Sequence, residues 1–326
     1  MFERTSLGVI RVARKLFRNT WVHRLPLTTR LYRYLFYTVY RGVEKEVEFR
    51  GNRYIIPTTD ITIAPSLLSG DYESFELDLF EQVLRPGMTV LDIGANIGIY
   101  SINAARRISP GRVYAFEPVP ENVSLLRRNI DLNGLDNVDV IPSAVGERDG
   151  VAPIFLASTI GTHSLARKNA LGIAGRRVSG AASGEDGSSE HLDVPMTTID
   201  QFVAERSLDV AVMKMDIEGY EGFGCAGAAE TLSKRPIFFM EFSEPHIREC
   251  GYDPGALMDR LLRTYDFCYR IDERRMQLFR IRHGPEVEGL WNENLIFLPH
   301  EAAARAVTTA ATLRRSAARR LRSVSA

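Results

Sequence analysis

The sequence contains few of the features that would place it outside the cell or across a membrane. It has three cysteines, an odd number without a CxxC pair, which argues against a disulfide scaffold and a zinc site and fits a reducing compartment. No apolar run reaches membrane-spanning length, and the N-terminus has neither an uninterrupted apolar segment nor a clear cleavage site. We therefore expect a cytoplasmic protein without a signal peptide.

A net charge is also missing, because 41 Lys and Arg balance 41 Asp and Glu, so the chain has no global nucleic-acid signature. The charge is uneven, however. Residues 1–33 carry eight Lys or Arg and one acid, and residues 305–326 carry six Arg and no acid. We predict a basic amphipathic extension over residues 1–50, read as helix, a main domain over 51–300, and a basic Ala/Arg-rich tail over 301–326. Basic ends with aromatics favour the hypothesis of peripheral contact with the anionic inner membrane surface.

The middle of the chain alternates between aliphatic runs and helical patterns. A hairpin is predicted over 51–65 and a helix over 70–87. Strands are expected at 88–93, 112–117, 138–145, 209–217 and 236–242, then 267–272 and 293–299, with helices at 99–108, 121–134, 197–205, 221–234 and 253–265 between them. Residues 146–196 break this rhythm with short strands around a Gly/Ser-rich stretch, and we interpret them as an inserted acceptor and lid region. Aliphatic strands alternating with helices indicate a mostly parallel sheet covered on both faces.

The stretch LDIGANIG, which ends at Gly98, follows the first strand of this pattern. Ligands bind at the carboxyl ends of strands in open α/β sheets. A dinucleotide site would need G-x-G-x-x-G, whereas here the glycines Gly94 and Gly98 follow an acid, Asp92. An acid is a poor neighbour for a pyrophosphate but suits a cationic cofactor. Glu117 ends the next strand, where it can accept ribose hydroxyls, as a carboxylate does in both nicotinamide and S-adenosylmethionine sites. Because the third glycine and the phosphate partners are missing, we predict S-adenosylmethionine as the cofactor.

Several motifs together resemble the FkbM family of S-adenosylmethionine-dependent methyltransferases. They are GDYESFE, PGMTVLDIGANIGIYS, VYAFEPVPENVSLLRRNIDLNG, SAVGERDG, VPMTTIDQFV, VMKMDIEGYE and a strand ending in MEF, in this order from about residue 71 to 269. The resemblance implies a Rossmann-like class I methyltransferase fold, α/β, with a seven-stranded, mostly parallel sheet, helices on both faces and an antiparallel last strand. It also implies methyl transfer, often to a hydroxyl oxygen of a saccharide, a glycolipid or a natural product.

The same resemblance implies cofactor-binding roles for residues that match the family's motifs. The methionine end of the pocket would be shaped by Asp92, Gly94, Ala95, Asn96 and Gly98. Glu117 would hold the ribose with Pro118 and Asn122 beside it, Ser143 and Ala144 would lie along the adenine, and Glu73 would approach the cofactor from the preceding helix.

Methyl transfer to a hydroxyl needs an aligned acceptor and a group that accepts its proton. Asp216 and Glu218 follow the fourth strand and Glu241 ends the fifth, so these carboxylates are the candidate catalytic residues. Lys214 is expected to pair with the acids beside it. His163, in the inserted region, is a further candidate, and His246 a weaker one. No His or Cys spacing supports a metal, and none is predicted.

The acceptor carries no recognisable signature in the sequence, although Trp291 and Tyr220 could stack on a sugar. The leading hypothesis is an O-methyltransferase acting on a small molecule or glycan. The alternatives are methyl transfer to RNA, which the balanced charge disfavours, and a non-catalytic protein that binds S-adenosylmethionine or a partner. The oligomeric state is not predicted.

Overall fold

The computed structural model describes residues 44–58, 63–155 and 191–324, and the side chains up to Ser316. The chain divides into two compact units, with a boundary along the chain between Tyr72 and Glu73. The described part of the first unit contains a two-stranded antiparallel sheet, β1 (Glu44–Phe49) and β2 (Asn52–Pro57), and the short helix α3 (Ala64–Ser69).

The hairpin corrects two of our predictions. It spans residues 44–57 and not 51–65, and β1 is a strand where a helix was expected up to residue 50. In β1 the last apolar residues alternate with acids, which is the period of a strand. Arg50 and Gly51 both adopt positive φ, of 53° and 74°, as in the two-residue turns that match strand twist. The predicted domain boundary at residue 50 therefore falls inside this turn.

The second unit is built on an eight-stranded sheet in the order β12-β11-β13-β10-β9-β3-β4-β5. The five strands from β10 to β5 are parallel, and β13 and β12 run antiparallel to their neighbours. The strands are β3 (Thr89–Ile93), β4 (Arg112–Phe116), β5 (Val138–Ile141), β9 (Val210–Met215), β10 (Ile237–Phe242), β11 (Phe267–Asp272), β12 (Gln277–Ile281) and β13 (Glu293–Leu298).

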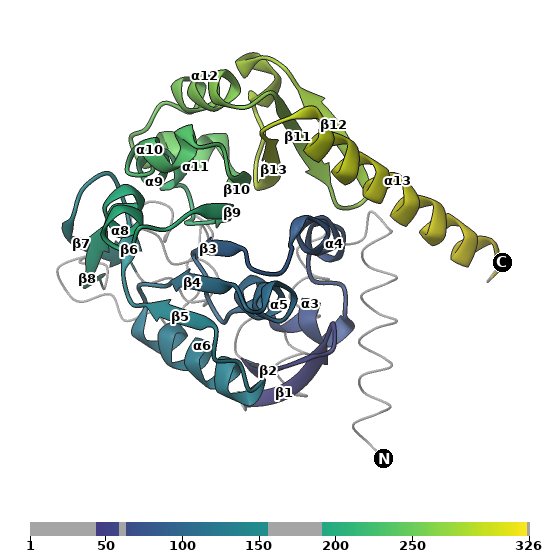
Figure 1. The fold of residues 1–326 in the computed structure, drawn as a ribbon, viewed down its shortest axis with the longest axis horizontal. Helices are drawn as coiled ribbons and strands as arrows, with labels where there is room; N and C mark the ends of the chain where they lie inside the picture. The colour runs from purple at the N-terminus through teal and green to yellow at the C-terminus, as the bar shows by residue number, and fades with distance from the viewer. Residues whose placement is uncertain (1–43, 59–62, 156–190, 325–326) are drawn as a thin grey trace, which may run out of the picture. The chain divides into compact units, whose positions relative to one another are not determined.

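The helices cover both faces of this sheet, as Figure 1 shows. On one face lie α4 (Ser74–Val83), α5 (Ile99–Ile108), α6 (Pro120–Leu132) and α13 (Glu301–Val324). On the other lie α8 (Ile199–Glu205), α9 (Glu221–Ala226), α10 (Ala229–Ser233), α11 (Glu244–Glu249) and α12 (Pro254–Thr264), and the 3₁₀ turn η3 (Gly284–Val287) precedes β13. This confirms the Rossmann-like, doubly wound sheet. The seven expected strands are present, the last antiparallel, and β12 adds an eighth at the edge.

Local sequence signals account for several helix ends. Thr198 accepts a hydrogen bond from the backbone N–H of Gln201 at the start of α8, and Asp253 accepts one from Gly255 before Pro254 opens α12. The predicted helix over 221–234 is instead two helices, α9 and α10. It breaks at Gly227, where a Cβ would lie 2.0 Å from the backbone oxygen of Gly146.

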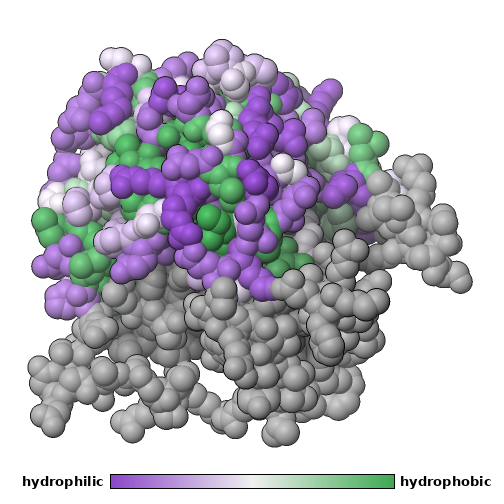
Figure 2. Space-filling view, turned by 90° about the horizontal axis from the view of Figure 1, so that it is seen from below, coloured by the Kyte–Doolittle hydropathy of each residue, from purple (hydrophilic) through white to green (hydrophobic). Residues whose placement is uncertain are grey.

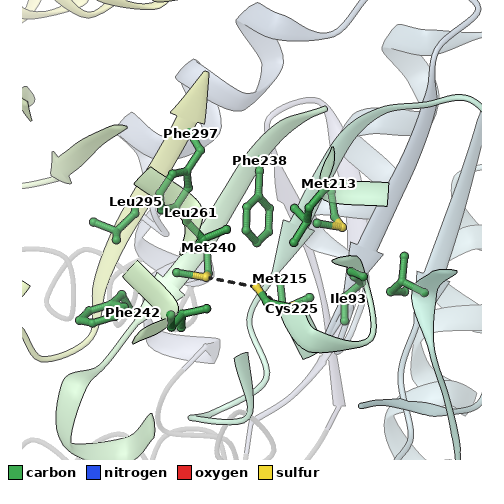
Figure 3. Close-up of a cluster of buried hydrophobic side chains, with 14 of the residues drawn as sticks. Ile93, Met213, Met215, Cys225, Phe238, Met240, Phe242, Leu261, Leu295 and Phe297 are labelled. Carbon is green, nitrogen blue, oxygen red and sulfur yellow. Dashed lines mark hydrogen bonds between the residues drawn. The ribbon is translucent and has the colours of Figure 1, made fainter. Parts of the chain in front are cut away.

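The main core lies between the sheet and the helices α8, α9 and α12. Met213, Met215, Phe238 and Met240 from the two central strands pack around Cys225 of α9, whose Sγ is 3.9 Å from Sδ of Met240 (Figure 3). These side chains are fully buried and carry no charge. The charged residues Asp92, Lys214 and Glu241 alternate with these side chains along β3, β9 and β10 and so leave the sheet on the opposite face, toward α4 and α5, where Phe80 and Phe239 are also buried.

The inserted region contributes a small sheet of its own, in the order β6-β8-β7. It consists of β6 (Ala144–Val145), β7 (Gly150–Phe155) and β8 (His191–Thr197), packed around Ala152, Val194 and Met196. The remainder of the predicted lid, including His163, lies outside the described residues, and its role stays a prediction.

The predicted tail over 301–326 is, in its first half, part of the second unit. α13 buries Ala304, Val307 and Ala311 on one face, and Arg314 forms an ion pair with Asp78 of α4. Buried residues at i, i+3 and i+7 are the pattern of a helix that packs on its neighbours. The boundary at residue 300 therefore does not separate a domain from a free tail.

Two observations on the described residues concern membrane contact. No helix in the described part of the chain is both long and apolar enough to cross a membrane. On the face shown in Figure 2, hydrophobic residues form small patches separated by hydrophilic ones. The proposed peripheral contact depends mainly on residues 1–43, outside the described ranges, and stays a prediction.

Replacing Val307 tests whether α13 is structural. Val307 is fully buried, so Val307→Ala removes apolar side-chain volume from the packing of α13 in the second unit. It should lower the free energy of unfolding by about 2 kcal/mol. The exposed neighbour Arg305 is the control, and Arg305→Ala should change stability by less than about 0.5 kcal/mol. Equal midpoints for the two variants in urea unfolding would show that α13 does not contribute to the core.

Candidate cofactor site and active site

The glycine turn after β3 brings two strand ends into direct contact. Gly94 has φ of 83° and Gly98 has φ of 92°, a conformation that L side chains rarely adopt. A Cβ on Gly94 would lie 1.8 Å from the backbone oxygen of Asp216, at the end of β9. Gly94 and Ala95 also donate their N–H groups to the carbonyl of Phe116, at the end of β4. The turn thus joins the carboxyl ends of β3, β4 and β9.

Glu117 is buried directly beside this turn. Its Oε2 accepts a hydrogen bond from the backbone N–H of Asn96 at 2.9 Å, and its Oε1 accepts from the N–H of Val119 at 2.9 Å and from Nδ2 of Asn122 at 3.2 Å. Burial raises the pKa of Glu117 to about 7 although these three donors oppose the rise. Oδ1 atoms of Asn96 and Asn122 are buried without a hydrogen-bond partner among the described residues. This pocket therefore retains unused acceptors beside a carboxylate.

Asp92 is the innermost acid of the site. It is 1% exposed, and its Oδ2 accepts a hydrogen bond from Oγ of Ser101 at 2.5 Å, while Oδ1 has no partner among the described side chains. In the sheet register Asp92 lies opposite Lys214 of β9. Burial raises the pKa of Asp92, and the attraction of Lys214 opposes that rise.

Lys214 lies among the acids at the ends of these strands. Its Nζ lies 3.0 Å from Oδ2 of Asp216 and 4.4 Å from the centre of the Tyr100 ring. Burial acts to lower the pKa of Lys214, but the combined attraction of Asp216, Glu73 and other acids raises it above its usual value. Lys214 is therefore charged in the folded protein, and its predicted pairing with the neighbouring acid is confirmed.

Glu73 reaches the same cluster from the start of α4. It adopts φ of 35°, in the left-handed region, and its Oε2 accepts a hydrogen bond from the hydroxyl of Tyr100 at 2.8 Å. Burial raises the pKa of Glu73, and Lys214 lowers it. A residue held at positive φ without being glycine is strained, and strain of this kind is concentrated at functional sites.

The position of Glu73 depends on a residue that the sequence analysis missed. Glu273, which follows β11, accepts hydrogen bonds from the backbone N–H groups of Phe75 and Glu76 at 2.8 and 3.1 Å. It thereby supplies the cap that the side chain of Glu73 does not provide. Glu76 is itself 2% exposed, and burial raises its pKa well above the usual value.

A second group of acids lies at the ends of β9 and β10. Burial raises the pKa values of Glu218 and Glu241 well above the usual range, and the negative charge of Asp216 raises both further. Glu218 has φ of 56°, again left-handed. Glu221 accepts hydrogen bonds from the N–H groups of Ile217 and Gly219 and so fixes the loop after β9. The structure thus brings Asp216, Glu218 and Glu241 together as predicted.

Ser143, Ala144 and Pro118 are the remaining candidates for cofactor binding within the described residues. Ser143 is buried, and its hydroxyl donates to the carbonyls of Ala144 and Pro195, so it ties β6 to β8. Ala144 is buried and Pro118 half-buried. Their roles along the adenine and ribose stay predictions. Within the described ranges no group of three or more His, Cys, Asp or Glu is arranged to hold a metal ion.

A family model for the methyltransferase FkbM domain matches residues 92–270, which is more than half of the chain. The chain belongs to this family. The matched segment begins at Asp92 and contains the glycine turn, Glu117, Lys214 and the acids of β9 and β10. The resemblance inferred from the motifs is therefore confirmed, and with it the assignment of the chain to a methyltransferase family with a Rossmann-like fold.

Two curated relatives illustrate the range of proteins to which the chain is similar. The 31-O-demethyl-FK506 methyltransferase FkbM of Streptomyces tacrolimicus is 28% identical over 163 residues, 45% of this chain and 62% of the relative. A ribosomal protein L11 methyltransferase of Caldanaerobacter subterraneus is 34% identical over 85 residues, 26% of this chain and 27% of the relative. The chain thus spans between about a quarter and three fifths of these proteins. An rRNA methylase structure from Streptococcus thermophilus is 9% identical over 69% of this chain and 93% of its own, with a TM-score of 0.38.

Substitution of Gly94 tests the close approach of the turn to β9. Gly94→Ala would place a methyl group against the backbone of Asp216 and should lower stability by more than about 3 kcal/mol. Gly134→Ala is the matched control, because Gly134 also has positive φ, of 62°, but open space around it, and it should cost only about 1 kcal/mol. Similar thermal midpoints for the two variants would mean that the approach is not tight.

The pKa of Glu117 predicts a pH-dependent stability difference. A carboxyl whose pKa is raised from 4.5 to about 7 on folding stabilises the fold below pH 4.5, and this contribution is lost as pH rises through 7. Glu117→Gln does not titrate, so its stability relative to the wild type should rise between pH 5 and pH 8 by on the order of 3 kcal/mol. Hydrogen bonds lost in the variant lower its stability by the same amount at both pH values. A difference in the free energy of urea unfolding between the variant and the wild type that does not change with pH would contradict the raised pKa.

Proposed function

We propose that the chain is an S-adenosylmethionine-dependent O-methyltransferase whose acceptor is a hydroxyl of a saccharide, glycolipid or natural product. The observation that carries the proposal is a surplus of acidic side chains at the carboxyl ends of β3, β4 and β9. Glu73, Asp92, Glu117 and Asp216 converge there, and Lys214 is the cation that opposes them. A site that is short of positive charge favours a cationic ligand over a pyrophosphate.

The side chains of the turn fit S-adenosylmethionine in particular. Glu117 would hold the ribose hydroxyls, since a carboxylate at this strand end accepts from both. Asp92 and Glu73 would face the methionine part, where the cofactor carries its ammonium and sulfonium charges. The unpartnered Oδ1 atoms of Asp92, Asn96 and Asn122 supply acceptors for its polar hydrogens. When bound, the cofactor would supply an activated methyl group.

The chain's own contribution to catalysis would be alignment and proton transfer. Glu241 is half-buried at the end of β10, and its pKa is raised well above the usual range by desolvation and by neighbouring acids, which makes it a stronger base than an exposed glutamate. We assign it the acceptor's hydroxyl proton. Asp216, paired with Lys214, would orient the acceptor together with Glu218.

The alternatives rest on weaker observations. Methyl transfer to RNA would require the acid-lined ends of β9 and β10 to face a phosphate backbone, which their charge opposes. The ribosomal protein L11 methyltransferase is similar to this chain over about a quarter of its length only. A non-catalytic role would leave the neighbouring carboxylates of Asp216, Glu218 and Glu241 without a purpose that offsets their mutual repulsion.

Calorimetric titration with S-adenosylmethionine and, in parallel, with NAD tests the cofactor. The wild type should bind S-adenosylmethionine and not NAD. Glu117→Ala should weaken binding at least tenfold, because the ribose loses its acceptor. Binding of NAD, or equal S-adenosylmethionine affinity in both proteins, would contradict the proposal.

The isosteric variant Glu241→Gln tests the proposed base. It should lower kcat by 10²–10⁴ and leave the affinity for S-adenosylmethionine unchanged, because only proton transfer is lost. The wild-type kcat should rise with pH as Glu241 ionises, and this rise should disappear in the variant. Glu230→Gln, on the exposed face of α10, is the control. A kcat close to wild type in Glu241→Gln would move the base to Glu218 or Asp216.

A further inference from the structure

An exposed tryptophan stands beside the carboxyl end of β10. Trp291, in the loop before β13, has 65% of its surface exposed. The loop is fixed to the start of α11, since the carbonyl of Leu290 accepts a hydrogen bond from the backbone N–H of Glu244 at 3.0 Å and the N–H of Gly289 donates to Oε2 of Glu244. The tryptophan is therefore presented by a braced segment of the second unit.

Two buried polar side chains accompany it. Ser243 is 1% and His246 is 7% exposed, and neither Oγ of Ser243 nor Nδ1 of His246 has a hydrogen-bond partner among the described residues. The imidazole lies edge-on to the indole, with ring centres 6.0 Å apart. Buried polar atoms without partners are rare in folded proteins, and a ligand that satisfies them is a physical reason for keeping them.

This group lies next to the proposed base. Glu241 and Ser243 are two residues apart on extended backbone, so their side chains leave β10 on the same face. Asn294 of β13 is the register partner of Glu241. Trp291 lies three residues before Asn294, in the loop that leads into β13.

We propose that Trp291, His246 and Ser243 form a saccharide subsite that holds the acceptor's sugar ring while Glu241 faces its hydroxyl. The inference rests on the proposed function. The indole offers an apolar face for the C–H surface of a pyranose, and Ser243 and His246 offer donors and acceptors for its hydroxyl groups. Burial lowers the pKa of His246, so its ring is neutral and can accept as well as donate a hydrogen bond.

The neighbouring charges define which sugars fit. The carboxylates of Glu218, Glu221 and Glu241 repel one another. Lys214, which attracts Glu218 and Glu241, is already paired with Asp216. A uronic acid or a sugar phosphate would add a further negative charge and be repelled. A neutral or amino sugar would not, so the subsite should prefer an amino sugar, then a neutral one, and reject an acidic one.

The chain allows this to be measured directly, because Trp21 and Trp291 are its two tryptophans. In full-length Trp21→Phe the emission reports on Trp291 alone. With saturating S-adenosylhomocysteine, we would titrate glucosamine, methyl β-D-glucopyranoside and glucuronate. The expected result is a saturable change in emission, with half-saturation at least fivefold lower for glucosamine than for glucuronate. His246→Ala in this background should weaken glucosamine binding at least tenfold, whereas Val151→Ala, at an exposed position on β7, should not change it.

The outcomes separate this inference from the function on which it rests. A protein that binds S-adenosylhomocysteine but whose Trp291 emission responds to none of the three sugars would overturn the subsite and leave the cofactor assignment intact. Equal half-saturation for glucosamine and glucuronate would overturn the charge preference. Failure to bind S-adenosylhomocysteine at all would overturn the proposed function and this inference together.

Discussion

The buried ammonium group of Lys214 is the interaction on which the site depends. A charge inside a protein is tolerated only when opposite charges and hydrogen bonds surround it. Lys214 meets that condition through Asp216 directly after its own strand, Asp92 on β3 and Glu73 at the start of α4. Because these acids come from separate elements, the lysine holds α4, β3 and β9 in one arrangement. Removing it would leave several buried carboxylates without their compensating charge.

The same balance explains how the fold prepares for its ligand. The acids around Lys214 outnumber it, and burial raises the pKa values of Glu73, Asp92 and Glu117. Such a site is costly without a ligand and improves when a cation and hydroxyl donors enter. The apolar core on the other face of the sheet, around Cys225 and the central methionines and phenylalanines, supplies stability that offsets this cost (Figure 3).

Local chemistry determines which parts of this could be predicted from the sequence. The glycine turn and the pair of Lys214 with Asp216 each depend on residues close together in the chain, and both were predicted. The cap that Glu273 gives to α4 joins residues 198 apart, and no periodicity signals it. The hairpin over 44–57 was misplaced because its basic and aromatic surroundings favoured a helix, and β12 was missed because a five-residue edge strand carries little pattern.

The central claim is that the surplus of acids selects a cationic cofactor, and a charge comparison tests it most directly. S-adenosylmethionine and S-adenosylhomocysteine differ by the methyl group and the positive charge on sulfur. We would measure both affinities by calorimetry on the wild type and on Asp92→Asn and Glu73→Gln. If the acids act through charge, each variant should lose several-fold more affinity for S-adenosylmethionine than for S-adenosylhomocysteine. Equal losses for the two ligands would show that these residues shape the pocket without selecting charge, and would contradict the account.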